Sequence, residues 1–209
     1  MIINPRRDIF NEMADNWDNM MTIDEDREKT INHIMNESQI ETDDNILDVG
    51  CGTGILTPFI LDRIGKKGRL TGIDVSDKMI NIALKKHKSS NLKFIVGDIQ
   101  ERDIERNGFK RNSFDKIILF SCFPHLDEKE KLLNNILPDL VKRQGKVIIC
   151  HLDSSQDINN FHSNLDNEIL SKDYLPSTKD LSNMLDKSKW DIIKEIDKTG
   201  LYLFILSRK

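Results

Sequence analysis

Hydrophobic positions along the chain follow two periodicities. Short runs of β-branched and aliphatic residues predict five strands, at residues 45–49, 69–74, 92–96, 114–122 and 145–150. Apolar residues at spacings of three and four predict helices over residues 24–40, 55–64, 76–87 and 127–141. Strands that alternate with helices predict an α/β domain with a mostly parallel sheet, in which every parallel strand ends at the same edge.

Both ends of the chain add to this core. Phe10, Met13 and Trp17 are spaced by three and four, which predicts one face of a helix after Pro5 within residues 2–19. At the other end, residues 190–196 and 201–207 are apolar runs joined by a tight turn at Gly200, which predicts a hairpin. The expected fold is a doubly wound, seven-stranded sheet with an antiparallel C-terminal strand.

Three glycines at alternate positions follow the first strand, in the stretch NILDVGCGTG from Asn45 to Gly54. They allow a sharp turn, a close approach of the backbone to a ligand, and tight packing at a helix start. The dinucleotide fingerprint requires a small residue where Ile55 stands. Asp48 would repel a pyrophosphate but suits a ligand with an ammonium and a sulfonium, and S-adenosylmethionine carries both.

The motif of an acid, one spacer and G-x-G-x-G resembles the class I S-adenosylmethionine-dependent methyltransferases, best between Asn45 and Cys150. The arrangement looks like the small-molecule branch related to the ubiquinone and menaquinone methyltransferases. The resemblance implies a Rossmann-like fold and S-adenosylmethionine as cofactor, and does not extend to the acceptor; a small-molecule methyl acceptor is expected because the basic residues are dispersed. Ser121-Cys122-Phe123-Pro124 stands where methyltransferases of amide and base nitrogens carry N-P-P-Y or D-P-P-Y, which disfavours those acceptors.

Acidic residues close two further strands. Asp74 lies about twenty residues after the glycine loop, where a carboxylate can hold the ribose hydroxyls, and Ser76 is the better cap for the next helix, which leaves Asp74 free. By resemblance Asp98 accepts the adenine amine and Ile99 packs on the ring; an ordinary turn aspartate is the alternative. The expected cofactor-binding set is Asp48, which would also orient the glycine loop, with Gly50, Cys51, Gly52, Gly54, Asp74, Val75, Met79, Gly97, Asp98, Ile99 and Ser121.

Three histidines fall near the same predicted edge. His125 follows the fourth strand, His151 follows the fifth, and His162 lies in the segment after it. His125 and His151 are expected to face a common cavity beside the transferred methyl group, with His162 as a roof. We expect catalytic work, as a base or in orienting the acceptor, because histidine titrates near working pH. A metal site that also uses Asp153, and plain structural roles, are the alternatives; the ligand spacing is a weak metal signal, so no metal is assigned.

We expect a single domain over residues 1–209. Residues 1–44 form an N-terminal helical lid or simply pack on the core, residues 45–150 bind the cofactor, residues 151–189 form a substrate-side insertion, and residues 190–209 form the hairpin.

Composition narrows the class of partner. The net charge is −4, from 31 basic and 35 acidic residues, and the basic residues are dispersed, which argues against nucleic acid. No apolar run is long enough for a membrane, and three unpaired cysteines are typical of a reducing cytoplasm. We expect a cytoplasmic monomer or homodimer. A non-catalytic cofactor-binding module and a nicotinamide-dependent oxidoreductase are the rival functions.

Overall fold

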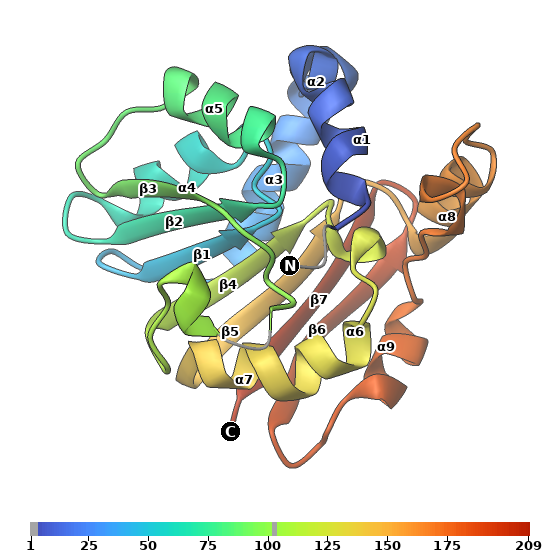
Figure 1. Cartoon of the computed structure of the whole chain (residues 1–209). Coiled ribbons are helices and arrows are strands. Elements are labelled where there is room, and N and C mark those ends of the chain that lie inside the picture. Colours follow the sequence, from blue (N-terminus) through green and yellow to red (C-terminus); the bar gives the residue numbers. More distant parts are fainter. Residues whose placement is uncertain (1–3, 102–103) are drawn as a thin grey trace.

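The computed structural model of the protein describes residues 4–101 and 104–209. In this part of the chain, seven strands form one sheet in the order β3-β2-β1-β4-β5-β7-β6 (Figure 1). The strands are β1 (Asn45–Val49), β2 (Arg69–Asp74), β3 (Leu92–Val96), β4 (Phe114–Phe120), β5 (Val141–His151), β6 (Trp190–Lys198) and β7 (Leu201–Arg208). Strands β1 to β5 pair in parallel, and β7 runs antiparallel to both β5 and β6. The predicted sheet, with its antiparallel C-terminal strand, is confirmed.

Helices connect and cover the strands. They are α1 (Arg6–Met13), α2 (Trp17–Met20), α3 (Glu25–Glu37), α4 (Thr57–Ile64), α5 (Asp77–Lys86), α6 (Lys129–Lys131), α7 (Leu137–Leu140), α8 (Ser155–Ser163) and α9 (Thr178–Met184). Short 3-10 turns lie at Ala14–Asn16, Ile104–Asn107, Phe123–His125 and Leu170–Lys172. Several helices begin where a side chain accepts a free backbone N–H: Asp24 caps α3, and the predicted Ser76 caps α5.

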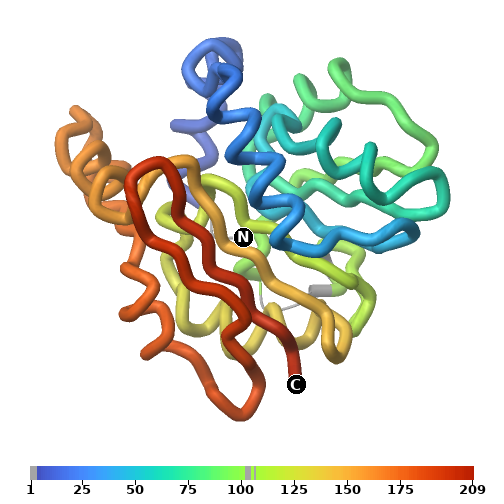
Figure 2. The backbone as a smooth tube through the Cα atoms, turned by 180° about the vertical axis from the view of Figure 1, so that it is seen from behind, coloured from blue at the N-terminus to red at the C-terminus, as the bar shows by residue number. Residues whose placement is uncertain are grey.

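Two hydrophobic layers enclose the sheet. Strand residues that alternate along the chain point to opposite faces, so Tyr202 and Phe204 of β7 join one core cluster while Leu203 and Ile205 join the other. The first layer lies under the helical segment from α6 to α7, in front of the sheet in Figure 1. The second lies under α3 and α4, which are in front when the molecule is seen from behind (Figure 2). Both faces are therefore covered, as the apolar β4 run predicts.

The predicted helix over residues 127–141 is interrupted. Between α6 and α7, residues Leu132–Ile136 form a π-helical turn, in which the N–H of Leu137 donates to the carbonyl of Leu132 five residues earlier. Pro138 explains the widened turn, because its ring has no N–H to donate and would clash with the carbonyl of a regular preceding turn.

The fifth strand is longer than the predicted residues 145–150. It begins at Val141, opposite Phe114, and the register then shifts before Lys146 pairs with Lys116. Gln144 adopts a φ of 62° in this irregular stretch, a backbone region that glycine favours. The strand also includes His151, which had been expected to follow it.

The N-terminal helix is broken into α1 and α2 by the 3-10 turn at Ala14–Asn16. Residues 2 and 3 of the expected segment lie outside the described residues. Within the described ranges, no helix is both long and apolar enough to cross a membrane.

Candidate functional site

The glycine loop after β1 is held by backbone bonds. Gly50, Gly52 and Gly54 have φ values of 64°, 53° and 83°, and the N–H groups of Gly50 and Cys51 donate to the carbonyl of Ile73 on β2, at 2.8 and 3.2 Å. A Cβ on Gly50 would lie 2.4 Å from the Cβ of Cys122, so only glycine fits between β1 and the end of β4.

A cavity opens beside this loop at the carboxyl edge of the sheet, with about 660 Å³ of space not occupied by protein atoms, its mouth included. Residues at the ends of β1, β2, β3 and β4 line it together with the N-terminal segment. The lining residues are Asn4, Arg6, Phe10, Trp17, Val49, Gly50, Gly52, Ile73, Asp74, Val75, Met79, Gly97, Asp98, Ile99, Ser121, Cys122, His125 and Leu126. Nine of the twelve expected cofactor residues are among them. The exceptions are Asp48, Cys51 and Gly54.

These three residues lie outside the cavity lining. Asp48 and Cys51 line a smaller hollow that shares Trp17, Gly50, Gly52 and Ser121 with the cavity. Gly54 lines neither space, because it packs on His87, whose ring would lie 2.7 Å from an added Cβ. Gly54 therefore provides the tight packing that the sequence analysis expects of one of the three glycines.

Asp74 is bonded to the protein, whereas the sequence predicted a free carboxylate. Its two oxygens accept the N–H of Gly52 at 2.9 Å and the N–H of Ser76 at 2.8 Å. The carboxylate therefore positions the glycine loop, a task expected of Asp48, whose carboxyl makes no hydrogen bond within the described residues. Burial raises the pKa of Asp74, and these two N–H donors oppose the effect.

Asp98 also lines the cavity, after the neighbouring strand β3. One oxygen accepts the N–H of Gln100 and the other accepts the side-chain amide of Asn4, both at 2.9 Å. Ile99 beside it is buried and lines the cavity. An acid and an apolar side chain thus lie together here, and Asn4 of the N-terminal segment donates to one of the acid's oxygens.

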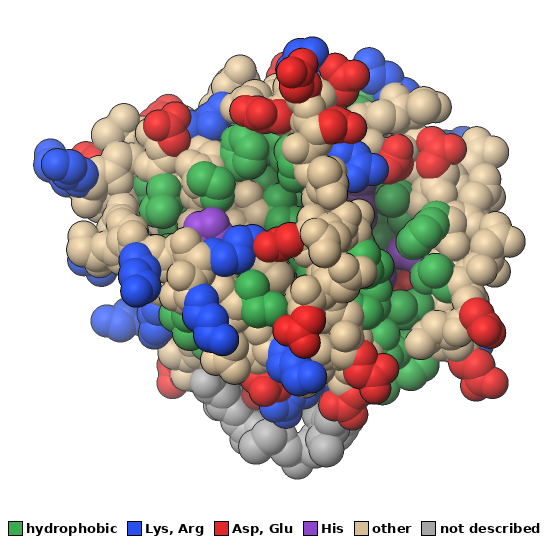
Figure 3. All heavy atoms as spheres, turned by 90° about the horizontal axis from the view of Figure 1, so that it is seen from above, with side chains coloured by type: hydrophobic (Ala, Val, Ile, Leu, Met, Phe, Trp, Pro, Cys, Tyr) green, Lys and Arg blue, Asp and Glu red, His purple; other side chains and the backbone are tan. Residues whose placement is uncertain are grey.

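The N-terminal segment closes over these elements. Trp17 reaches the glycine loop, with its indole Nε1 3.5 Å from the position of a Cβ on Gly52, and its ring meets that of Phe10 edge to face. Asp18 accepts the Thr53 hydroxyl at 2.5 Å and the Lys86 ammonium at 2.6 Å. Seen from above, on the side that carries α1 and α2, this face shows both acidic and basic side chains, with hydrophobic side chains between them (Figure 3).

One histidine of the expected three lines the cavity. His125 sits in the 3-10 turn after β4, and the Lys129 ammonium steadies that turn by donating to the carbonyls of Pro124 and Leu126. His151 is buried behind the edge against Tyr202, with its Nε2 unpartnered, so it does not share the cavity. Burial lowers the pKa of His151 to about 3, with weaker contributions from the other two histidines.

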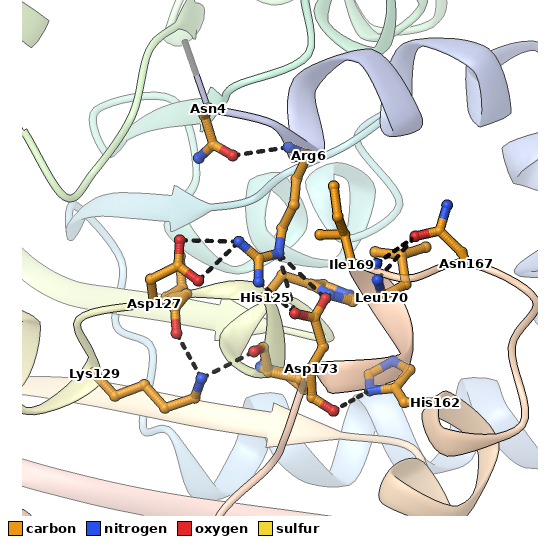
Figure 4. Close-up of polar contacts among 12 residues, drawn as sticks. Asn4, Arg6, His125, Asp127, Lys129, His162, Asn167, Ile169, Leu170 and Asp173 are labelled. Atoms are coloured by element: carbon orange, nitrogen blue, oxygen red, sulfur yellow. Dashed lines mark hydrogen bonds and ion pairs between the residues drawn. The ribbon is translucent and has the colours of Figure 1, made fainter. Parts of the chain in front are cut away.

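His162 packs beside His125 and does not roof the cavity. The two ring centroids are 5.2 Å apart, and the Nδ1 atom of His162 lies 3.1 Å from the backbone carbonyl of Asp173 (Figure 4). Burial lowers the pKa of His162 and keeps its ring neutral. In residues 4–101 and 104–209, no group of three or more His, Cys, Asp and Glu side chains is placed to hold a metal ion.

Sequence reasoning missed Asp173 and Arg6. Asp173 bonds to the Nδ1 atom of His125 at 2.5 Å and to the guanidinium of Arg6. Neither residue lies in a motif, and they are 167 positions apart. The only sequence signals were the Asp173-Tyr174-Leu175-Pro176 turn in the insertion and a charge at the start of the expected lid.

Comparison with known proteins identifies the family of this chain. Residues 40–198 match a family described as a methyltransferase domain, and the chain belongs to that family. The predicted class, an S-adenosylmethionine-dependent methyltransferase domain, is thereby confirmed.

Individual relatives extend the family match. The ubiquinone/menaquinone biosynthesis C-methyltransferase of Wigglesworthia glossinidia brevipalpis is 33% identical over 68% of this chain and 57% of its own length. A malonyl-[acyl-carrier protein] O-methyltransferase of Acetivibrio thermocellus is 30% identical over 63% of this chain and 44% of its own. The chain thus spans about half the length of the curated relatives it matches. A SAM-dependent methyltransferase from Aquifex aeolicus shares the fold, with a TM-score of 0.68 at 19% identity, over 90% of this chain and 95% of that one.

Proposed function

We propose that this protein binds S-adenosylmethionine in the cavity at the carboxyl edge of the sheet and transfers its methyl group to a small-molecule acceptor. One observation carries the proposal: the glycine loop and the carboxylates of Asp74 and Asp98, at the ends of three adjacent strands, surround one cavity that His125 also lines. Ligands of open α/β sheets bind at this edge.

The residues present fit the cofactor. Its ammonium and sulfonium groups are cationic, and three carboxyl groups lie in the cavity or the adjoining hollow. We assign the ribose to Asp74, the adenine to Asp98 and Ile99, and the amino acid moiety to the hollow that Asp48 lines. Val75 and Met79 add apolar wall beside the ribose.

Methyl transfer needs little covalent help from the protein. When bound, S-adenosylmethionine supplies a methyl group activated by a sulfonium, which a nucleophilic atom takes in line while sulfur keeps the electron pair. The chain contributes by orienting the two partners and excluding water. Residues 1–44 act as the lid through Phe10 and Trp17, and residues 151–189 border the acceptor side. His125 faces the acceptor and assists it, whereas His151 and His162 have structural roles.

The acceptor class follows from several lines of support. The relatives are named for quinone biosynthesis and for a malonyl group on a carrier protein, and both reactions methylate small groups. The net charge of −4 and the acidic side chains that share the face in Figure 3 with basic ones argue against nucleic acid as the acceptor. We infer a small-molecule acceptor and a monomer or homodimer.

The test combines binding with transfer. Isothermal titration with S-adenosylhomocysteine and with NAD is followed by incubation with methyl-labelled S-adenosylmethionine and fractionated extract of the source organism. We expect S-adenosylhomocysteine to bind, NAD not to bind, and label to enter one small molecule. Binding without transfer in any fraction would support a non-catalytic module instead, and binding of NAD alone would support an oxidoreductase. Label in protein or nucleic acid would overturn the acceptor class.

A further inference from the structure

A buried charged cluster joins three distant segments beside the cavity. Asp173, from the insertion, is 4% exposed and lies between Arg6 of α1 and His125 of the turn after β4 (Figure 4). The Arg6 guanidinium donates to the Asp173 carboxylate through Nε at 3.1 and 3.2 Å and through Nη2 at 2.5 Å. The His125 Nδ1 atom lies 2.5 Å from the Asp173 Oδ2 atom.

The charges of this cluster fix the position of a proton. Burial alone would raise the pKa of Asp173, but the hydrogen bonds from His125 and Arg6 outweigh it and lower that pKa. A guanidinium remains protonated in proteins, so Arg6 keeps the Asp173 carboxylate ionised. An ionised carboxylate only accepts hydrogen bonds, and His125 must therefore donate through Nδ1–H. In the neutral ring, Nε2 then carries a lone pair.

The Nε2 atom of His125 is available to a ligand. It makes no hydrogen bond among the described residues, it is not a buried orphan, and the side chain keeps 15% of its surface exposed. The same ring lines the cavity and meets Phe10 edge to face, with centroids 5.1 Å apart. Burial lowers the pKa of His162, the other imidazole in contact with it, and so favours the neutral form of that ring.

We propose that Asp173 is a positioning residue, held ionised by Arg6, that fixes His125 with Nε2 free to remove the proton of a hydroxyl acceptor. The proposal rests on the proposed function and adds a chemical class of acceptor: a weakly acidic hydroxyl on an apolar body, such as a phenol or enol.

In this step the proton of the acceptor hydroxyl is transferred to His125. The acceptor O–H bond breaks, its proton moves to Nε2, and the oxygen keeps the electron pair with which it bonds to the methyl carbon. The imidazolium so formed carries a positive charge beside the Asp173 carboxylate, which stabilises it, and later releases its proton to water.

The walls near His125 suit a hydroxyl acceptor. Phe10, Cys122 and Leu126 provide apolar surface for the body of the molecule. Arg6 also lines the cavity, with its guanidinium paired to the carboxylates of Asp173 and Asp127. Because Arg6 belongs to α1, the cluster is complete only when the N-terminal segment is packed on the site.

Two measurements test the tautomer of His125 and the methyl transfer separately. Long-range proton–nitrogen NMR spectra of histidine-labelled, ligand-free protein should show the neutral His125 ring protonated at Nδ1, and Asp173→Asn should shift protonation toward Nε2. Asp127→Asn is the matched control, because Asp127 also bonds to Arg6 but is exposed and does not touch His125. It should leave the His125 tautomer unchanged. The wild-type spectrum alone decides the tautomer if Asp173→Asn fails to fold.

Transfer is then followed with carbon-13 methyl-labelled S-adenosylmethionine and source extract. We expect an oxygen-bound methyl signal in the product, and Asp173→Asn should lower turnover at least about tenfold while S-adenosylhomocysteine binds within about twofold of wild type. A neutral wild-type ring protonated at Nε2, or a changed tautomer with unchanged turnover, would overturn the role of Asp173. A methyl on nitrogen, carbon or sulfur would overturn the acceptor class. If the wild-type protein does not bind S-adenosylhomocysteine, the proposed function itself is refuted.

Discussion

Asp48 is a single residue whose ionisation at the site lowers the stability of the folded protein, because its carboxyl group is buried. It is 3% exposed, and burial, with the neighbouring Asp74 carboxylate, raises its pKa to about 8. The unfolded chain would ionise Asp48 near pH 4, so the folded state binds the extra proton between these values. The stability associated with that proton is complete below about pH 4 and is lost as the pH rises through 8.

Asp48→Asn removes this titration. The variant should unfold at a temperature roughly 2–4 °C or more above wild type at pH 8.5, because about 1 kcal/mol shifts a domain of this size by that amount. It should also bind S-adenosylhomocysteine more weakly at this pH, since it lacks the carboxylate that we assign to the ligand's ammonium. Scanning calorimetry and titration calorimetry measure the two effects, and equal or lower thermal stability at pH 8.5 would contradict the assigned burial cost.

Asp74 should have the opposite balance, because its carboxylate is already satisfied by the protein. Asp74→Ala removes the acceptor for the N–H groups of Gly52 and Ser76 and the expected ribose partner. We expect S-adenosylhomocysteine affinity to fall by about 1 to 3 kcal/mol, roughly 5-fold to 150-fold. Asp62→Ala, on the exposed face of α4, is the control and should bind as wild type does. Unchanged affinity in Asp74→Ala would refute the ribose assignment.

At the scale of elements, the N-terminal segment contacts every loop that borders the cavity. Asn4 holds Asp98 after β3, Arg6 holds Asp173 in the insertion, and Asp18 bridges Thr53 and Lys86. The Asp18 ion pair is partly exposed, and such pairs contribute at most about 1 kcal/mol to stability. If the N-terminal segment acts as the proposed lid, the larger effect of this ion pair should be on how fast that segment opens.

Asp18→Ala should therefore leave unfolding almost unchanged but release S-adenosylhomocysteine several-fold faster. Trp17 supplies the signal, because it covers the glycine loop while Trp190 is buried and bonds to the carbonyl of Leu133. Stopped-flow fluorescence measures the release, and the ligand-induced change should vanish in Trp17→Phe. Asp26→Ala, which removes an exposed ion pair on α3, is the control. Equal release rates in Asp18→Ala and wild type would show that the Asp18 contacts do not control the opening of the N-terminal segment.

For the whole molecule, acid sensitivity should trace to His151. This residue is 2% exposed, and its depressed pKa of about 3 means that it stays neutral in the folded state. The unfolded chain binds the proton from about pH 6.5 downward, so the stability that the neutral ring allows is present above pH 6.5 and is lost as the pH falls toward 3. The slope for one proton is about 1.4 kcal/mol per pH unit.

Replacing His151 with phenylalanine keeps a ring against Tyr202 and removes the proton site. Urea unfolding between pH 6.5 and 5 should show a shallower loss of stability for His151→Phe than for wild type. His33→Gln, an exposed substitution on α3, is the control and should follow the wild-type slope. Identical slopes in His151→Phe and wild type would show that another group governs acid unfolding.

Much of this molecule is determined locally by its sequence. Strands β2 and β3 have the predicted bounds, and Ser76 caps its helix as expected, because periodicity and caps depend on neighbours a few residues away. The glycine loop was recognisable for the same reason: its spacing sets the turn. The order of strands and helices then fixed which strand ends share an edge.

The tertiary structure decided what the side chains at that edge do. His125 and His151 both stand at strand ends, yet one lines the cavity and the other is buried against β7, because the direction of a side chain depends on register and on the strand packed beside it. Asp173 and Arg6 carry no local signature, since their pairing exists only when the insertion and α1 close on the same turn. Sequence periodicity determined the strands and the glycine loop, whereas contacts between distant segments decided which histidine lines the cavity.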